Sequence, residues 1–211
     1  MPSPSAFYRE EYAEAARGGY SPEDELTFPK RMAAALSAVG PGPKRVLDFG
    51  CGTGAGSKLL IAAGHTVTGV DASESGIQLA RAQVPSGTFH HLDDESDLPF
   101  ENATFDACVC TEVIEHLLDV RGFLSEMHRV LVPGGILFIT TPYHGWLKNL
   151  LLITMNFDRH FNATGEHIRF FSRPSLVACL TEAGFQVEQF GGIGRFWPVW
   201  KSMFVVARNQ S

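Results

Sequence analysis

Hydrophobic positions change period several times between about residues 44 and 140. Short apolar runs rich in β-branched residues predict strands, and apolar positions spaced one turn apart predict the helices between them. The predicted strands are residues 45–50, 65–71, 87–92, 104–110 and 134–142, and the predicted helices are residues 54–64, 73–84 and 120–131. Strands joined by helices of this length imply right-handed crossovers and a parallel sheet that is covered on both faces.

The alternation of predicted strands and helices stops after Pro142 and resumes near residue 172. Residues 143–171 mix aromatic, histidine and leucine positions, so they are interpreted as an insertion between the fifth strand and its crossover helix. A helix at 172–184 and strands at 185–192 and 201–209 follow. Residues 1–40 are interpreted as an N-terminal helical extension, in which Ser21 caps a helix that begins at Pro22.

The composition limits the class of protein. Hydrophobic residues make up 45% and charged residues 19% of the 211 positions, which is typical of a single folded domain rather than a disordered chain. A net charge of −6 argues against a long basic groove for nucleic acid. The four cysteines form no CxxC pair, and no apolar run reaches the ~20 residues that span a bilayer. With no secretory pattern at the N-terminus, a cytoplasmic location is predicted.

A glycine-rich segment, Asp48-Phe49-Gly50-Cys51-Gly52-Thr53-Gly54, closes the first predicted strand. Glycines at such a turn let backbone amides approach a ligand closely, and an acid at the end of the second strand, Asp71, can accept hydrogen bonds from ribose hydroxyls. The spacing does not fit the GxGxxG pattern of dinucleotide oxidoreductases. An acid at position 48 suits a cationic ligand better than a pyrophosphate.

Four motifs in order, "VLDFGCGTG", "GVDAS", "DLPFENATFDACVC" and "RVLVPGGILFITTP", resemble the class I S-adenosylmethionine-dependent methyltransferases. The resemblance is close over residues 44–140 and looser over residues 172–211. It implies a single α/β domain of the doubly wound, Rossmann-like type, with a seven-stranded mostly parallel sheet and an antiparallel last strand. Asp93 and Asp94 compete for the adenine contact, and Asp94 is favoured. The implied cofactor-binding residues are Asp48, Gly50, Gly52, Gly54, Asp71, Ala72, Asp94, Cys110 and Thr111.

The stretch "TEVIEH" places Glu112, Glu115 and His116 at offsets that would share one face of a helix. The ubiquinone-biosynthesis O-methyltransferases, and the methyltransferases that modify the 3′-terminal 2′-hydroxyl of small RNAs, pair a similar motif with a later histidine, here His167. The resemblance to these groups implies a divalent metal, such as Mg, Mn or Zn, held by Glu112, Glu115, His116 and His167. The alternative is that one acid caps a helix and His116 lies in the cleft as a general base.

The substrate that accepts the methyl group is predicted to contact the insertion at residues 143–171. His144, His160 and His167 are further candidates for the base, because histidine titrates near neutral pH. The apolar segment 146–153 could line a hydrophobic pocket, touch a membrane surface, or pack on the core as a lid helix.

The favoured function is O-methylation of a small molecule of the catechol or quinone type, and nucleic acid is not the expected partner. The alternatives are 2′-O-methylation of an RNA 3′ end and a non-catalytic module that binds the cofactor. The sequence does not indicate an oligomeric state.

Overall fold

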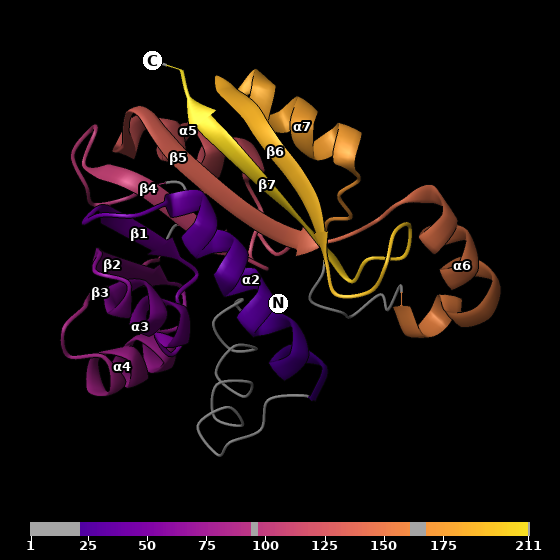
Figure 1. Cartoon of the computed structure of the whole chain (residues 1–211), viewed down its shortest axis with the longest axis horizontal. Helices are drawn as coiled ribbons and strands as arrows, with labels where there is room; N and C mark the ends of the chain where they lie inside the picture. The colour runs from indigo at the N-terminus through magenta and orange to yellow at the C-terminus, as the bar shows by residue number, and fades with distance from the viewer. Residues whose placement is uncertain (1–21, 94–96, 161–167, 211) are drawn as a thin grey trace.

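The computed structural model describes residues 22–93, 97–160 and 168–210, and the side chains of residues 26–93, 97–155 and 168–210. Seven strands form one sheet in the order β3-β2-β1-β4-β5-β7-β6 (Figure 1). The strands are β1 (Arg45–Phe49), β2 (Thr66–Asp71), β3 (Thr88–His91), β4 (Phe105–Thr111), β5 (Leu131–Pro142), β6 (Phe185–Ile193) and β7 (Ser202–Asn209). Strand β7 runs antiparallel to both neighbours, so the predicted fold class is confirmed.

Helices cover both faces of this sheet (Figure 1). They are α2 (Pro22–Val39), α3 (Ala55–Ala62), α4 (Glu74–Gln83), α5 (Val120–Val130), α6 (Trp146–His160) and α7 (Arg173–Glu182). Successive strand residues point to opposite faces. Phe138 therefore packs in the core shared with α2 and α3, whereas its neighbour Ile139 packs in the core shared with α5 and α7.

Local signals in the sequence set several helix ends. The Ser73 hydroxyl accepts a hydrogen bond from the Gly76 amide at 3.1 Å and caps α4, as a serine at this position predicts. Asp119 caps α5 by accepting from the Gly122 amide at 2.9 Å. Ser172 forms a capping box with Ser175 at the start of α7.

Two expectations need correction. Residues 112–116 form a turn and not a helix, because the chain bends sharply after β4 and Glu112 adopts a φ of 54°. Helix α5 begins at Val120, where the sequence predicts its start. Strand β5 starts at Leu131, three residues before the predicted start, and its pairing with β4 shifts register between Phe105 and Ala107.

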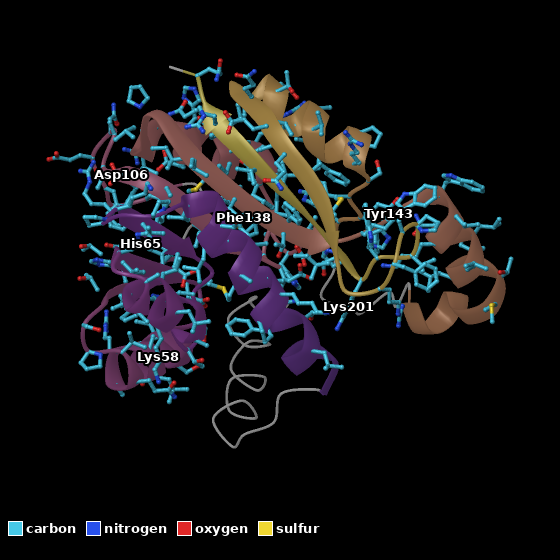
Figure 2. All side chains as sticks on the ribbon, viewed as in Figure 1. Lys58, His65, Asp106, Phe138, Tyr143 and Lys201 are labelled. Atoms are coloured by element: carbon cyan, nitrogen blue, oxygen red, sulfur yellow. The ribbon has the colours of Figure 1, made fainter. Side chains whose placement is uncertain are left out.

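The predicted insertion contains α6, which lies beside the loop between β6 and β7 (Figure 1). Tyr143 and Lys201 mark this end of the sheet, whereas His65 and Asp106 lie at the opposite end (Figure 2). Much of α6 is exposed, including apolar side chains at Trp146, Leu150 and Ile153. Among the helices within the described residues, none combines the length and the apolar character that crossing a bilayer requires.

Candidate functional site

The glycine loop leaves β1 at the point where the strand order reverses, between β1 and β4. Gly50, Gly52 and Gly54 have φ angles of 75°, 52° and 85°, which are backbone conformations that favour glycine. At Gly50, a Cβ atom would lie 2.2 Å from Cγ2 of Val113. The turn after β4 is therefore packed directly against the glycine loop.

Asp71 fixes this loop to the end of β2. Its Oδ2 accepts a hydrogen bond from the Gly52 amide at 2.8 Å, and its Oδ1 accepts one from the Ser73 amide at 2.8 Å. A carboxylate has further lone pairs on both oxygens, so these two bonds leave acceptor capacity for ribose hydroxyls. Asp71 thus has a structural role that its position in the motif did not indicate.

Asp48 is a buried carboxyl with an unusual electrostatic environment. Its side chain is 4% exposed, and Ser57 Oγ donates to its Oδ2 at 2.6 Å. Burial raises the pKa of Asp48 to about 6; the Ser57 hydrogen bond opposes this shift and the charge of Asp71 adds to it. No lysine or arginine within the described residues forms an ion pair with Asp48. A cationic ligand group at this position would supply the missing counter-charge, so the site fits such a ligand.

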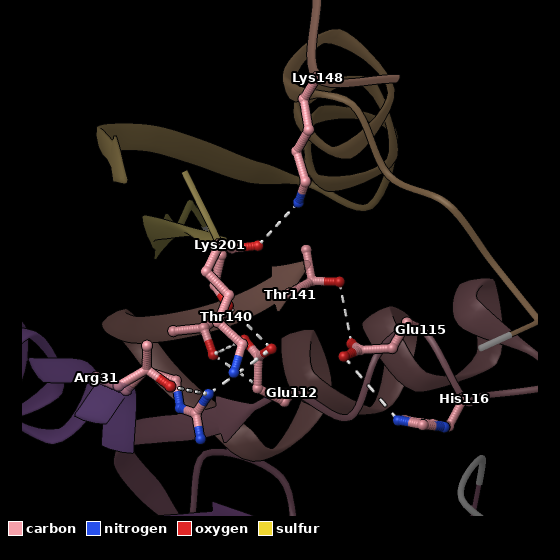
Figure 3. A network of polar contacts seen from close by, with 10 residues as sticks. Arg31, Glu112, Glu115, His116, Thr140, Thr141, Lys148 and Lys201 are labelled. Atoms are coloured by element: carbon pink, nitrogen blue, oxygen red, sulfur yellow. Dashed lines mark hydrogen bonds and ion pairs between the residues drawn. The ribbon is translucent and has the colours of Figure 1, made fainter. Parts of the chain in front are cut away.

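The side chains at the ends of β4 and β5 form a polar network (Figure 3). Thr140 Oγ1 donates to Glu112 Oε1 at 2.8 Å, and Ser202 Oγ donates to Glu112 Oε2 at 3.0 Å. The Arg31 guanidinium lies 3.8 Å from Glu112 Oε2 and approaches from α2. Four elements that are far apart in the sequence therefore meet at this carboxylate.

Glu115 is the most deeply buried acid of the network. Its side chain is 1% exposed, and its Oε2 accepts a hydrogen bond from Thr141 at 3.0 Å. Its Oε1 has no hydrogen-bond partner among the described residues and lies 4.0 Å from His116 Nε2. Burial raises the pKa of Glu115 well above its ordinary value, and the charge of Glu112 adds to the shift. The motif thus forms a carboxyl–imidazole pair beside a second acid.

As placed here, these three side chains do not form a metal site. Within the ranges that the structure describes, no group of three or more His, Cys, Asp or Glu residues could hold a metal ion. Glu112 turns toward Thr140 and Ser202, whereas Glu115 turns toward Thr141. The fourth predicted ligand, His167, lies outside the described residues.

The remaining predicted cofactor residues lie near the loop or outside the described ranges. Cys110 is buried in β4 between Phe49 and Ile139, and Thr111 ends the strand. Ala72 follows Asp71 at the end of β2.

Of the two candidates for the adenine contact, Asp93 alone belongs to the described residues. Asp94 lies outside the described residues. The competing Asp93 carboxylate is exposed and lies 3.7 Å from His91 Nδ1.

His144 is held within the insertion. Its Nδ1 lies 3.1 Å from the Asn149 side-chain oxygen, and its ring packs edge-on against Phe170 at 5.0 Å between centroids. The side chain of His160 lies outside the described residues. His116 is therefore the predicted base that the structure places beside the acidic network.

Sequence reasoning missed the residues that contact Glu112 and Glu115, namely Arg31, Thr140, Thr141 and Ser202. It also missed Ser57, which donates to Asp48, and the buried Lys148. A signal existed for the two threonines, since consecutive hydroxyl residues end the strand that lies beside β4. No local pattern indicated Arg31 or Ser202.

The family model described as "methyltransferase domain" matches residues 23–189 of this chain. The chain belongs to the class I S-adenosylmethionine-dependent methyltransferases. The methyltransferase is 34% identical over 148 residues to a probable S-adenosylmethionine-dependent methyltransferase of Mycolicibacterium smegmatis, covering 70% of this chain and 54% of that protein. It is 32% identical over 157 residues to the ubiquinone biosynthesis O-methyltransferase of Pseudomonas aeruginosa, covering 71% of this chain and 68% of that protein.

A solved structure shows the same fold over nearly the whole methyltransferase. The complex between the Haloferax volcanii methyltransferase activator Trm112 and a methyltransferase contains a chain that superposes with a TM-score of 0.75. The match covers 96% of both chains at 17% sequence identity, and at this identity it supports the fold alone.

The raised pKa of Asp48 predicts how cofactor affinity depends on pH. If Asp48 binds a cationic ammonium such as that of S-adenosylhomocysteine, the ionised carboxylate is the form that binds, so protonation competes with binding. We expect the affinity for S-adenosylhomocysteine, measured by calorimetry, to fall about tenfold per pH unit below about 6. In the free protein the sign is opposite: because the pKa is raised, ionising Asp48 makes the fold less stable as pH rises from about 4 to about 6.

The control separates Asp48 from other titrating groups. Asp48→Asn should flatten the pH profile of binding, whereas Asp106→Asn at the opposite end of the sheet should keep the wild-type slope. Equal slopes for wild type and Asp48→Asn would show that Asp48 does not face the cation.

Proposed function

We propose that this methyltransferase transfers a methyl group to a hydroxyl oxygen of a small molecule of the catechol or quinone type. The observation that carries the proposal is the pair of buried Glu115 and partly buried His116, which begins two residues after Val113, the residue that contacts the glycine loop. Oxygen acceptors require removal of a proton, and this pair offers a base next to the expected cofactor site. The Pseudomonas relative, named as an O-methyltransferase of ubiquinone biosynthesis, supports the same class of acceptor.

The cofactor supplies an electrophilic methyl group on its sulfonium, so the protein mainly aligns and deprotonates the acceptor. The glycine loop, whose Gly52 amide is bound to Asp71, lies with the carboxylates of Asp48 and Asp71 on the cofactor side of the site. The His116 imidazole takes the proton of the acceptor hydroxyl. Because burial makes the Glu115 carboxylate a stronger base than an ordinary one, Oε1 can share the proton with His116 Nε2 and stabilise the charged ring.

The divalent metal remains a separate proposal, and no step above depends on it. If Glu112, Glu115, His116 and His167 bind Mg, Mn or Zn, removal of metal by EDTA will abolish methyl transfer and addition of one ion will restore it. Elemental analysis of Glu115→Gln would then show a loss of bound metal relative to wild type.

The alternative acceptors and partners are less well supported. The net charge of −6 argues against an RNA end. The match to a methyltransferase family model argues against a non-catalytic module that only binds the cofactor. The exposed apolar side chains of α6, together with Phe196 and Trp197 in the β6–β7 loop, are compatible with an acceptor that has an apolar part or with a lipid surface. Flotation of the protein with vesicles separates these two readings. The cytoplasmic location stays a prediction.

The test is a methyl-transfer assay with labelled S-adenosylmethionine. We expect label in catechol and in alkyl-substituted catechols, identified as methyl ethers by mass spectrometry, and no label in a short RNA with a free 3′ end. Label in the RNA alone, or in an amine panel alone, would overturn the assignment of the acceptor and leave the family unchanged.

A further inference from the structure

Lys148 is a buried lysine that extends from α6 toward the polar network (Figure 3). Its side chain is 9% exposed, and its Nζ donates one hydrogen bond, to the backbone carbonyl of Lys201 at 3.2 Å. The same carbonyl also accepts from the Tyr143 amide at 3.1 Å. Within the described residues, no carboxylate lies within ion-pair distance of Lys148.

The surroundings of Lys148 add positive charge. Burial lowers the pKa of Lys148 to about 8; the charge of Arg195 acts in the same direction, that of Glu112 opposes it, and that of Lys201 again lowers the pKa. Arg195 lies exposed in the β6–β7 loop. In a chain of net charge −6, a local group of three cations is a departure that needs an explanation.

Glu112 partly offsets the positive charge around Lys148 but forms no ion pair with Lys148 in the described part of the chain. Both of its oxygens already accept hydrogen bonds from hydroxyl groups, and its nearest cation is Arg31. Burial of an ammonium group without a counter-ion is unfavourable, so such a group usually has an anionic ligand or partner. Two donors of the Lys148 ammonium have no protein acceptor in the described part of the chain.

The position of this group connects it with the acceptor side of the crevice. Lys201 directly precedes Ser202, whose hydroxyl donates to Glu112. Lys148 therefore lies on the insertion side of the network, and the glycine loop lies on the other side, against Val113. An acceptor that places its hydroxyl near His116 has the Lys148 ammonium on its insertion side.

We propose that Lys148, together with Arg195 and Lys201, binds a carboxylate or phosphate group carried by the methyl acceptor. The proposal rests on the proposed small-molecule function, which it makes more specific: the acceptor is an anionic hydroxyl compound. The cationic group would hold the anion on the insertion side while the hydroxyl faces the base.

The first experiment compares acceptors that differ only in charge. We expect wild type to use 3,4-dihydroxybenzoate at least tenfold more efficiently than 3,4-dihydroxybenzamide, with the difference in KM. Lys148→Met should reduce this preference to less than twofold, and Lys148→Arg should retain most of it. Lys58→Met, an exposed lysine of α3, should keep the wild-type preference (Figure 2). An unchanged preference in Lys148→Met would overturn the proposal.

A second measurement separates this proposal from the proposed function. Calorimetry of protein loaded with S-adenosylhomocysteine, titrated with inorganic phosphate or benzoate, should show binding that Lys148→Met loses and Lys58→Met keeps. Binding without methylation of any catechol would overturn the proposed reaction and support the anion site. Binding to vesicles with anionic lipid but to neither soluble anion would show that the three cationic side chains bind a lipid headgroup. That result would overturn the proposal that they bind a small anionic acceptor.

Discussion

Asp71→Ala is expected to lower the affinity of the methyltransferase for S-adenosylhomocysteine by about 100- to 1,000-fold, measured by calorimetry. The side chain accepts hydrogen bonds from the amides of Gly52 and Ser73, so its removal frees the loop and leaves two amides without a partner. Each hydrogen bond to a charged group contributes about 1.5–3 kcal/mol, and about 1.4 kcal/mol corresponds to a factor of ten in affinity. Loss of the expected ribose contact adds to the effect.

Two further variants make this result specific. Asp71→Asn retains the size of the side chain but loses one acceptor oxygen and the charge, so it should lose most of the affinity as well. Asp106→Ala removes an acid that pairs with Arg45 at the opposite end of the sheet and should leave affinity within twofold of wild type. Tight binding by Asp71→Ala would show that neither the loop nor the ribose depends on this carboxylate.

The fold was predictable because its signals are local. Strands β1, β2 and β4 are short, mostly apolar runs. Capping residues such as Ser73 directly precede the helices that they cap. The turn at 112–116 was not predictable in this way. Its conformation depends on packing of Val113 against Gly50, which is more than 60 residues away, and on the backbone hydrogen bond from the Glu112 amide to Thr140.

The candidate site likewise contains residues with a local sequence signal and residues that only the fold brings together. Most of the predicted cofactor residues lie in two short motifs at the ends of β1 and β2, so the sequence alone could indicate them. The surroundings of Glu112 come from α2, β5 and the start of β7, which meet only because the sheet order places β5 between β4 and β7. Lys148 gave no signal at all, because a lysine in a helix is usually exposed. Its burial depends on how α6 packs beside the β6–β7 loop.

His116→Ala is expected to lower kcat for the catechol-type acceptor by about 100- to 10,000-fold, the usual contribution of a general base. Affinity for S-adenosylhomocysteine should stay within twofold, since His116 is not among the predicted cofactor-binding residues and its ring lies beside Glu115. Glu115→Gln should lower kcat by a similar factor, because an amide cannot share the proton that the ring receives. His128→Ala, which removes a ring of α5 that packs on Phe185, is the matched control and should retain activity.

The double variant decides whether the two residues work as a pair. If Glu115 acts through His116, then His116→Ala combined with Glu115→Gln should be no slower than the worse single variant, because the second change removes nothing more. Multiplied losses would mean that the two side chains act on the acceptor separately. A metal would give a third pattern, in which both single variants lose bound ion and activity together and high concentrations of that ion partly restore turnover. Glu115 Oε1 has no hydrogen-bond partner among the described residues, and His116 Nε2 lies 4.0 Å from it, so we expect the first pattern.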